Sequence, residues 1–219
     1  ALVDAVLDMR SGASLSENVY IRRDKRIRDV AVLFLVDLSH STEEKVDGKP
    51  VIDIQKEAMV LMAEALDALA DPFAIYGFSS EGRFRVDMYS IKEFGEPYND
   101  TTRYRLGNLK PLGLTRMGAV VRHAAHKLEN NAAAVKLMVI LTDGRPYDLE
   151  YGNLDYAVKD TQKAIQEARR KNIHPFIITS DKKGTQYIRQ ISPQSQSIVL
   201  QKVEMLPRLL PTLYKRLTL

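Results

Sequence analysis

The chain has 219 residues, of which 45% are hydrophobic and 27% are charged. That length and composition fit one large α/β domain with a sizeable core. The absence of cysteine excludes disulfides and thiolate metal sites and favours a reducing compartment such as the cytoplasm. The net charge of +4 is mild and aromatic residues make up only 7%, so nucleic-acid binding is not indicated. No apolar run approaches the ~20 residues that a membrane span needs.

Residues 1–28 are predicted to form an extension of a domain that covers residues 29–219. The chain begins inside a predicted helix, from Leu2 to Arg10, without an initiator methionine, which is typical of a fragment excised from a longer protein. Five basic residues follow between Asn18 and Asp29. They fit either a patch for an acidic partner or a charged edge that discourages strand pairing, and we favour the second interpretation.

Strands and helices alternate along the remaining sequence. Six segments are apolar or alternate in polarity, as strands do, namely Val30–Val36, Phe73–Phe78, Arg83–Ile91, Val135–Leu141, Ile173–Thr179 and Ser197–Leu200. Six others are predicted helices, namely Asp53–Leu69, Pro97–Leu106, Met117–Leu128, Tyr156–Arg170, Gly184–Gln190 and Met205–Leu217. Arg83–Ile91 follows a short turn and alternates, so we expect an antiparallel edge strand. The order predicts a doubly wound, mostly parallel six-stranded sheet with helices on both faces.

Small polar residues follow the apolar run Val30–Val36 at once. Asp37, Ser39 and Ser41 alternate with two other residues, so their oxygens can converge on one side of an extended turn. The carboxyl end of a strand is where open α/β sheets bind ligands. Three convergent oxygens suit Mg²⁺ or a similar cation.

Two later positions have the same character. Thr115 stands just before a predicted helix, where its hydroxyl could cap the helix or face the same crevice as Asp37, and both interpretations stay open. Asp143 follows the strand Val135–Leu141 and precedes Gly144, which is hard to explain by packing. Asp143 therefore indicates a second carboxylate at the crevice.

Together, three motifs resemble the von Willebrand factor A domain and its metal-ion-dependent adhesion site. They are Asp37-x-Ser39-x-Ser41, Gly113-x-Thr115-x-x-Gly118 and Leu141-Thr142-Asp143-Gly144, in the order and spacing of that family. The likeness extends from about Asp29 to the C-terminus.

That resemblance implies a metal site with defined roles. Ser39 and Ser41 would coordinate the ion directly, Thr115 would do so in the open, ligand-bound form, and Asp37 and Asp143 would act through water. The ion would be Mg²⁺, or else Mn²⁺ or Ca²⁺. It would remain an electrophile, so an Asp or Glu of a partner protein could complete its coordination.

A narrower resemblance concerns the C-terminal domain of bacterial NorD and CbbO proteins. The phrases that carry it are Asp71–Ser80, Thr115–Ala119 and Leu141–Pro146. It implies a cytoplasmic adaptor for a hexameric AAA+ ATPase of the MoxR class. A CbbO-type adaptor would act with a CbbQ-like ATPase on inhibited Rubisco, and a NorD-type adaptor would assist maturation of nitric oxide reductase. We favour the CbbO type, because Tyr151–Tyr156 departs from the Tyr-Glu-Gly-Arg-Tyr phrase that NorD-like sequences often carry.

Enzymatic alternatives find less support, and we expect no catalytic residue and no organic cofactor. Gly48-Lys49 is not a phosphate loop, because Pro50 stands where a hydroxyl residue is needed, so ATP hydrolysis would belong to a partner. A metal-dependent hydrolase would need His40 as general base, but His40 alternates away from the ligand side. His123 and His126 have zinc-like spacing without a third ligand. Extracellular adhesion is disfavoured by the lack of cysteine and of an export signal.

Overall fold

The computed structural model describes residues 29–144, 146–181, 185–192 and 196–218. Its centre is a six-stranded sheet in the order β5-β4-β1-β6-β7-β8. The strands are β1 (Val30–Asp37), β4 (Phe73–Ser80), β5 (Val86–Lys92), β6 (Val135–Thr142), β7 (Ile173–Thr179) and β8 (Ser197–Val199). All neighbours pair in parallel except β5, which runs antiparallel to β4. The predicted fold class is thereby confirmed.

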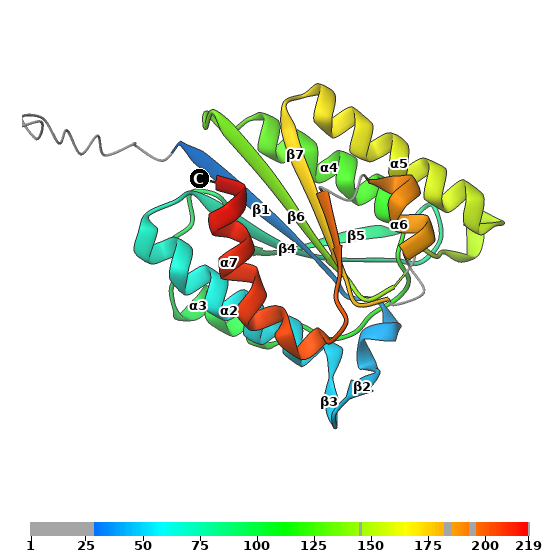
Figure 1. Ribbon diagram of the computed structural model, residues 1–219, viewed down its shortest axis with the longest axis horizontal. Coiled ribbons are helices and arrows are strands. Elements are labelled where there is room, and N and C mark those ends of the chain that lie inside the picture. Colours follow the sequence, from blue (N-terminus) through cyan, green and yellow to red (C-terminus); the bar gives the residue numbers. More distant parts are fainter. Residues whose placement is uncertain (1–28, 145, 182–184, 193–195, 219) are drawn as a thin grey trace, which may run out of the picture.

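Helices cover both faces of this sheet (Figure 1). One face carries α2 (Val51–Leu69), α3 (Asp100–Gly107) and α7 (Leu206–Thr218). The other face carries α4 (Met117–Glu129), α5 (Leu154–Arg170) and α6 (Thr185–Ile191). β1 is buried along its whole length, and Phe34 packs toward the first helix layer while Leu35 packs toward the second. This two-sided burial explains why the strand is apolar throughout.

The strand order places a crevice at one edge of the sheet. β4 and β6 flank β1 on its two sides. The chain leaves β1 through α2 on one face of the sheet, whereas it leaves β6 through α5 on the opposite face. The connections after β1 and β6 therefore diverge at their carboxyl ends. Ligands of doubly wound sheets bind at such a switch point.

A short helix and a hairpin connect β1 to α2. A short 3₁₀ helix, η1 (His40–Glu43), leads into a hairpin of β2 (Lys45–Val46) and β3 (Lys49–Pro50). The turn residues Asp47 and Gly48 have φ values of 49° and 82°, as a tight hairpin with an Asp-Gly turn requires. Two further 3₁₀ turns are η2 (Leu149–Tyr151) and η5 (Val203–Met205).

The edge strand is shorter than predicted. Phe84 was expected within it, but β5 begins at Val86 and Phe84 is exposed in the preceding turn. The predicted helix Leu2–Arg10 and the basic segment ahead of Asp29 lie outside the described residues. Within the described ranges, no helix combines the length and apolarity needed to cross a membrane.

Candidate metal site

Five oxygen-bearing side chains meet at the carboxyl edge between β1 and β6. The Oγ atoms of Ser39 and Ser41 lie 3.0 Å apart, and the Ser41 hydroxyl donates to Asp143 Oδ1 at 3.0 Å. From a third loop, the Thr115 hydroxyl lies 3.3 Å from each carboxylate oxygen of Asp37. All five residues singled out from the sequence are therefore neighbours.

Asp37 is held in place by the protein around it. It is fully buried, its Oδ1 accepts the backbone N–H of Ser39 at 2.9 Å, and its Oδ2 accepts the Thr142 hydroxyl at 2.7 Å. Thr142 had no predicted role. Its position could have indicated a role, because Thr142 ends β6 directly after Leu141, which pairs with Val36 of β1.

The two carboxylates share a desolvated environment. Burial raises the pKa of Asp37, and the hydrogen bonds from Thr142 and Ser39 offset that effect only in part. Burial, followed by the nearby negative charge of Asp37, raises the pKa of Asp143 to about 7. Among the described residues, no lysine or arginine forms an ion pair with either group. A bound cation would supply the missing positive charge.

The donor set fits a hard cation. Carboxylate and hydroxyl oxygens suit Mg²⁺, Mn²⁺ or Ca²⁺ better than softer metals. In the described part of the chain, no group of three or more His, Cys, Asp or Glu side chains is placed to hold a metal. An ion at this edge would therefore depend on the hydroxyls as well as on the two carboxylates.

The loop that carries Thr115 is fixed by main-chain pairing. Thr115 exchanges two hydrogen bonds with Tyr147, at 2.8 and 3.1 Å, and Leu114 exchanges two with Ser80, at 2.8 and 2.7 Å. α4 begins at Met117, and the residue at its N-cap is Arg116, whose side chain makes no capping bond. The interpretation of Thr115 as a helix cap is therefore wrong, and its hydroxyl faces Asp37 instead.

The buried carboxylate of Asp148 joins three loops behind Thr115. Asp148 accepts the Ser80 hydroxyl at 2.7 Å and lies 3.3 Å from Arg116 Nη2, while the backbone N–H of Arg116 donates to Ser80 Oγ at 3.0 Å. Burial alone would raise the pKa of Asp148. The hydrogen bonds from Ser80, the Glu150 backbone and Arg116 outweigh burial and leave that pKa below its ordinary value. No local sequence pattern indicates this network.

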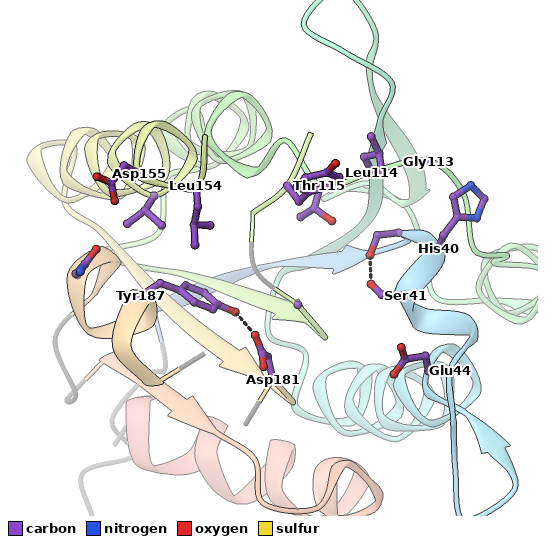
Figure 2. Close-up of a pocket in the computed structure, with 15 residues that line it drawn as sticks. His40, Ser41, Glu44, Gly113, Leu114, Thr115, Leu154, Asp155, Asp181 and Tyr187 are labelled. Carbon is purple, nitrogen blue, oxygen red and sulfur yellow. Dashed lines mark hydrogen bonds between the residues drawn. The ribbon is translucent and has the colours of Figure 1, made fainter. Parts of the chain in front are cut away.

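A pocket of about 860 Å³ opens beside the convergent oxygens. Ser39, Ser41 and Thr115 line one end, and Leu154, Val158 and Tyr187 line the other. Figure 2 shows the Ser41 and Thr115 side chains facing this space from different loops, with Leu154 across from them.

The histidines considered for catalysis or zinc binding are exposed. His40 lines the pocket beside Ser39 and Ser41, but Figure 2 shows its ring pointing away from Ser41. His123 and His126 are exposed on α4, and the described residues supply no third ligand for a zinc ion.

Relatives of known name support the narrower resemblance in part. The chain is 40% identical over 189 residues to Protein NorD of Stutzerimonas stutzeri, an alignment that covers 86% of this chain and 31% of that protein. It is 33% identical over 217 residues to Protein NorD of Brucella melitensis, covering 99% and 34%. The chain thus spans about a third of the length of these curated relatives. Their names favour the NorD-type alternative over the CbbO-type interpretation that we placed first.

Solved structures show the same fold at low sequence identity. The PilB minor pilin from Streptococcus sanguinis superposes with a TM-score of 0.67 at 16% identity, covering 87% of this chain and 61% of that chain. A von Willebrand factor type A structure from Catenulispora acidiphila superposes with a TM-score of 0.61 at 16% identity, covering 84% and 42%. At such identities the likeness is one of fold alone.

The family itself follows from a match across most of the sequence. The family model described as von Willebrand factor type A domain matches residues 31–210. This range includes every strand of the sheet except the first residue of β1, and all five residues at the crevice. The chain belongs to the von Willebrand factor type A domain family.

Proposed function

We propose that this domain is a metal-dependent, protein-binding adaptor of the NorD type. Mg²⁺, or Mn²⁺ or Ca²⁺ in its place, is held by the hydroxyls of Ser39, Ser41 and Thr115. Asp37 and Asp143 balance its charge, and an acidic side chain of a client protein completes its coordination. No catalytic residue is part of the proposal.

One observation carries this assignment: two desolvated carboxylates and three hydroxyls meet with no paired lysine or arginine among the described residues. A divalent ion relieves the repulsion between the carboxylates. Three protein hydroxyls are fewer ligands than the six that Mg²⁺ prefers, so positions remain for water and for a carboxylate from outside.

The adaptor role rests on the relatives and on the sequence. NorD proteins are the named relatives, and this chain has no phosphate loop of its own. Work that depends on ATP would therefore come from a hexameric MoxR-class AAA+ ATPase, in the cytoplasm where ATP is available. The client in this proposal is nitric oxide reductase, and Rubisco is the client that the less favoured CbbO-type interpretation would require.

A binding experiment tests the metal bridge. The full-length protein, with its ATPase present, is titrated with purified nitric oxide reductase complex in Mg²⁺ and then in EDTA, as wild type and as Asp143→Ala. Loss of one desolvated, charge-assisted contact costs about 2–4 kcal/mol, so chelation and the substitution should each weaken binding at least ~30-fold. Asp100→Ala is the control, because the Asp100 side chain is fully exposed on α3.

The possible results separate the interpretations. Metal-dependent binding that only Asp143→Ala abolishes supports the proposal. Binding by Asp143→Ala equal to that of wild type would overturn it. Metal-dependent binding of Rubisco with none of nitric oxide reductase would replace the NorD-type client by the CbbO-type one.

A further inference from the structure

The segment that leads from β6 into α5 exposes apolar side chains beside the candidate metal site. Tyr147, Leu149 and Leu154 have exposed fractions of 53%, 71% and 40%. All three line one hollow of about 210 Å³, and we call these three residues the apolar patch. Exposed apolar groups that gather in this way mark interaction sites more often than single exposed residues do.

We propose that the apolar patch is the second half of the client-binding surface. It receives an apolar side chain that lies next to the metal-binding carboxylate on the client protein. This inference rests on the proposed function, because it assigns a role to the surroundings of the same metal.

The patch is continuous with the candidate metal site. Tyr147 and Leu154 line the hollow and also the larger pocket that contains the Ser39, Ser41 and Thr115 hydroxyls. A client surface whose carboxylate reaches those hydroxyls therefore comes into contact with the patch. Since every acidic surface could offer a carboxylate, selection of one client depends on neighbouring contacts of this kind.

The size of the hollow favours a protein side chain over a small molecule. Pockets for drug-sized ligands usually measure ~300–1,000 Å³, and this hollow falls below that range. Its lining includes the buried residue Tyr151, so an apolar group that enters the hollow leaves water and comes close to an aromatic side chain.

The patch is held rigidly by its own segment. Tyr147 is paired to Thr115 through the main chain, and the Tyr151 hydroxyl donates to Asp160 Oδ2 at 2.9 Å. The Asn153 side chain caps α5 by accepting the N–H of Tyr156 at 2.8 Å. A surface that is already ordered loses little conformational entropy when a partner binds.

The charges of the segment define the partner further. Residues 146–158 contain three acidic residues and are flanked by Arg145 and Lys159. Asp148 is paired with Arg116 and Glu150 lies 3.9 Å from Arg83, whereas Asp155 is exposed and lines the larger pocket. The fitting partner presents one carboxylate to the metal, an apolar side chain to the patch, and neutral or basic residues beside them.

The experiment compares two pairs of leucines in the full-length protein with its ATPase present, using purified nitric oxide reductase complex as the probe. The test variant is Leu149→Ser/Leu154→Ser. The control is Leu61→Ser/Leu69→Ser, which removes two leucines of similar exposure, 51% and 48%, from α2. Each variant is also titrated with Mg²⁺ alone.

We expect the test variant to bind the probe at least 10-fold more weakly than wild type, with unchanged Mg²⁺ affinity and with the control unchanged. Binding within twofold of wild type, while Asp143→Ala abolishes it, would overturn the role of the patch and leave the metal bridge standing. Loss in the test variant with no effect of Asp143→Ala or EDTA would overturn the metal bridge but keep the patch as a docking surface. A wild-type dimer that the test variant loses would show that a second copy occupies the patch and would overturn the assignment to a client.

Discussion

Replacing Gly113 by alanine probes the close approach that fixes the Thr115 loop. A Cβ at this position would lie 2.3 Å from the backbone oxygen of Ser80, closer than real Cβ contacts come. The obstacle is main chain, so it cannot rotate away. The loop must therefore shift, which weakens the two hydrogen bonds between Leu114 and Ser80 and moves the Thr115 hydroxyl from Asp37.

The expected cost can be worked from these contacts. Overpacking costs about 1–3 kcal/mol, and weakening two main-chain hydrogen bonds adds up to about 1 kcal/mol each. We expect a loss of about 1–5 kcal/mol in the free energy of unfolding. For a chain of this size that corresponds to a fall in Tm of roughly 2–20 °C.

Calorimetric unfolding of the 219-residue chain measures the effect, with Gly107→Ala as the control. A Cβ on Gly107 would meet nothing within 4 Å, and the residue ends α3, so alanine there should be neutral or slightly stabilising. Gly118→Ala adds a graded comparison, because the nearest atoms to its Cβ would belong to the side chain of Asp160 and not to the main chain. If Gly113→Ala unfolds at the temperature of the Gly107 control, the close approach does not constrain this loop.

Two further predictions concern residues that act behind the site. Thr142→Val removes the hydroxyl that donates to Asp37 and should weaken Mg²⁺ binding about 10–100-fold by titration calorimetry. Thr161→Val is the control and should leave Mg²⁺ affinity unchanged, because the Thr161 hydroxyl donates to the backbone of its own helix. Equal Mg²⁺ affinities of the two variants would contradict the role of Thr142. Asp148→Asn should lower the free energy of unfolding at pH 7 by about 2 kcal/mol. Because the pKa of Asp148 is depressed in the folded state, its charged form adds stability that is lost as the pH falls. The difference in unfolding free energy between wild type and Asp148→Asn, measured by urea titration, should therefore shrink below about pH 4. A difference that does not depend on pH would refute this prediction.

The fold could be predicted because local patterns determine it. Val30–Asp37 is buried on both faces, and a strand in that position has to be apolar throughout. The Asp47-Gly48 turn also had a local signal, the Asp-Gly pair between two short strands.

The supporting contacts of the site could not be predicted in the same way. Asp37, Ser39 and Ser41 stand within five residues, so their proximity is local, although Ser41 lies in the 3₁₀ helix η1 and not in the extended turn that the alternation predicted. Thr142 reaches Asp37 across 105 residues of sequence, and Asp148 reaches Ser80 across 68. Such contacts depend on strand register and loop path, which no local pattern records.

The pairing of Thr115 with Tyr147 joins the two halves of the proposed client surface. In the proposed complex Thr115 supplies a hydroxyl to the metal and Tyr147 carries part of the apolar patch, and two hydrogen bonds of 2.8 and 3.1 Å connect their main chains. A movement of the apolar patch would therefore shift Thr115 directly through its main-chain hydrogen bonds with Tyr147, without rearranging the core. In the proposed complex, the fit of an apolar client side chain bears directly on the position of the hydroxyl that helps to hold the ion, so the two contacts should strengthen each other rather than add independently.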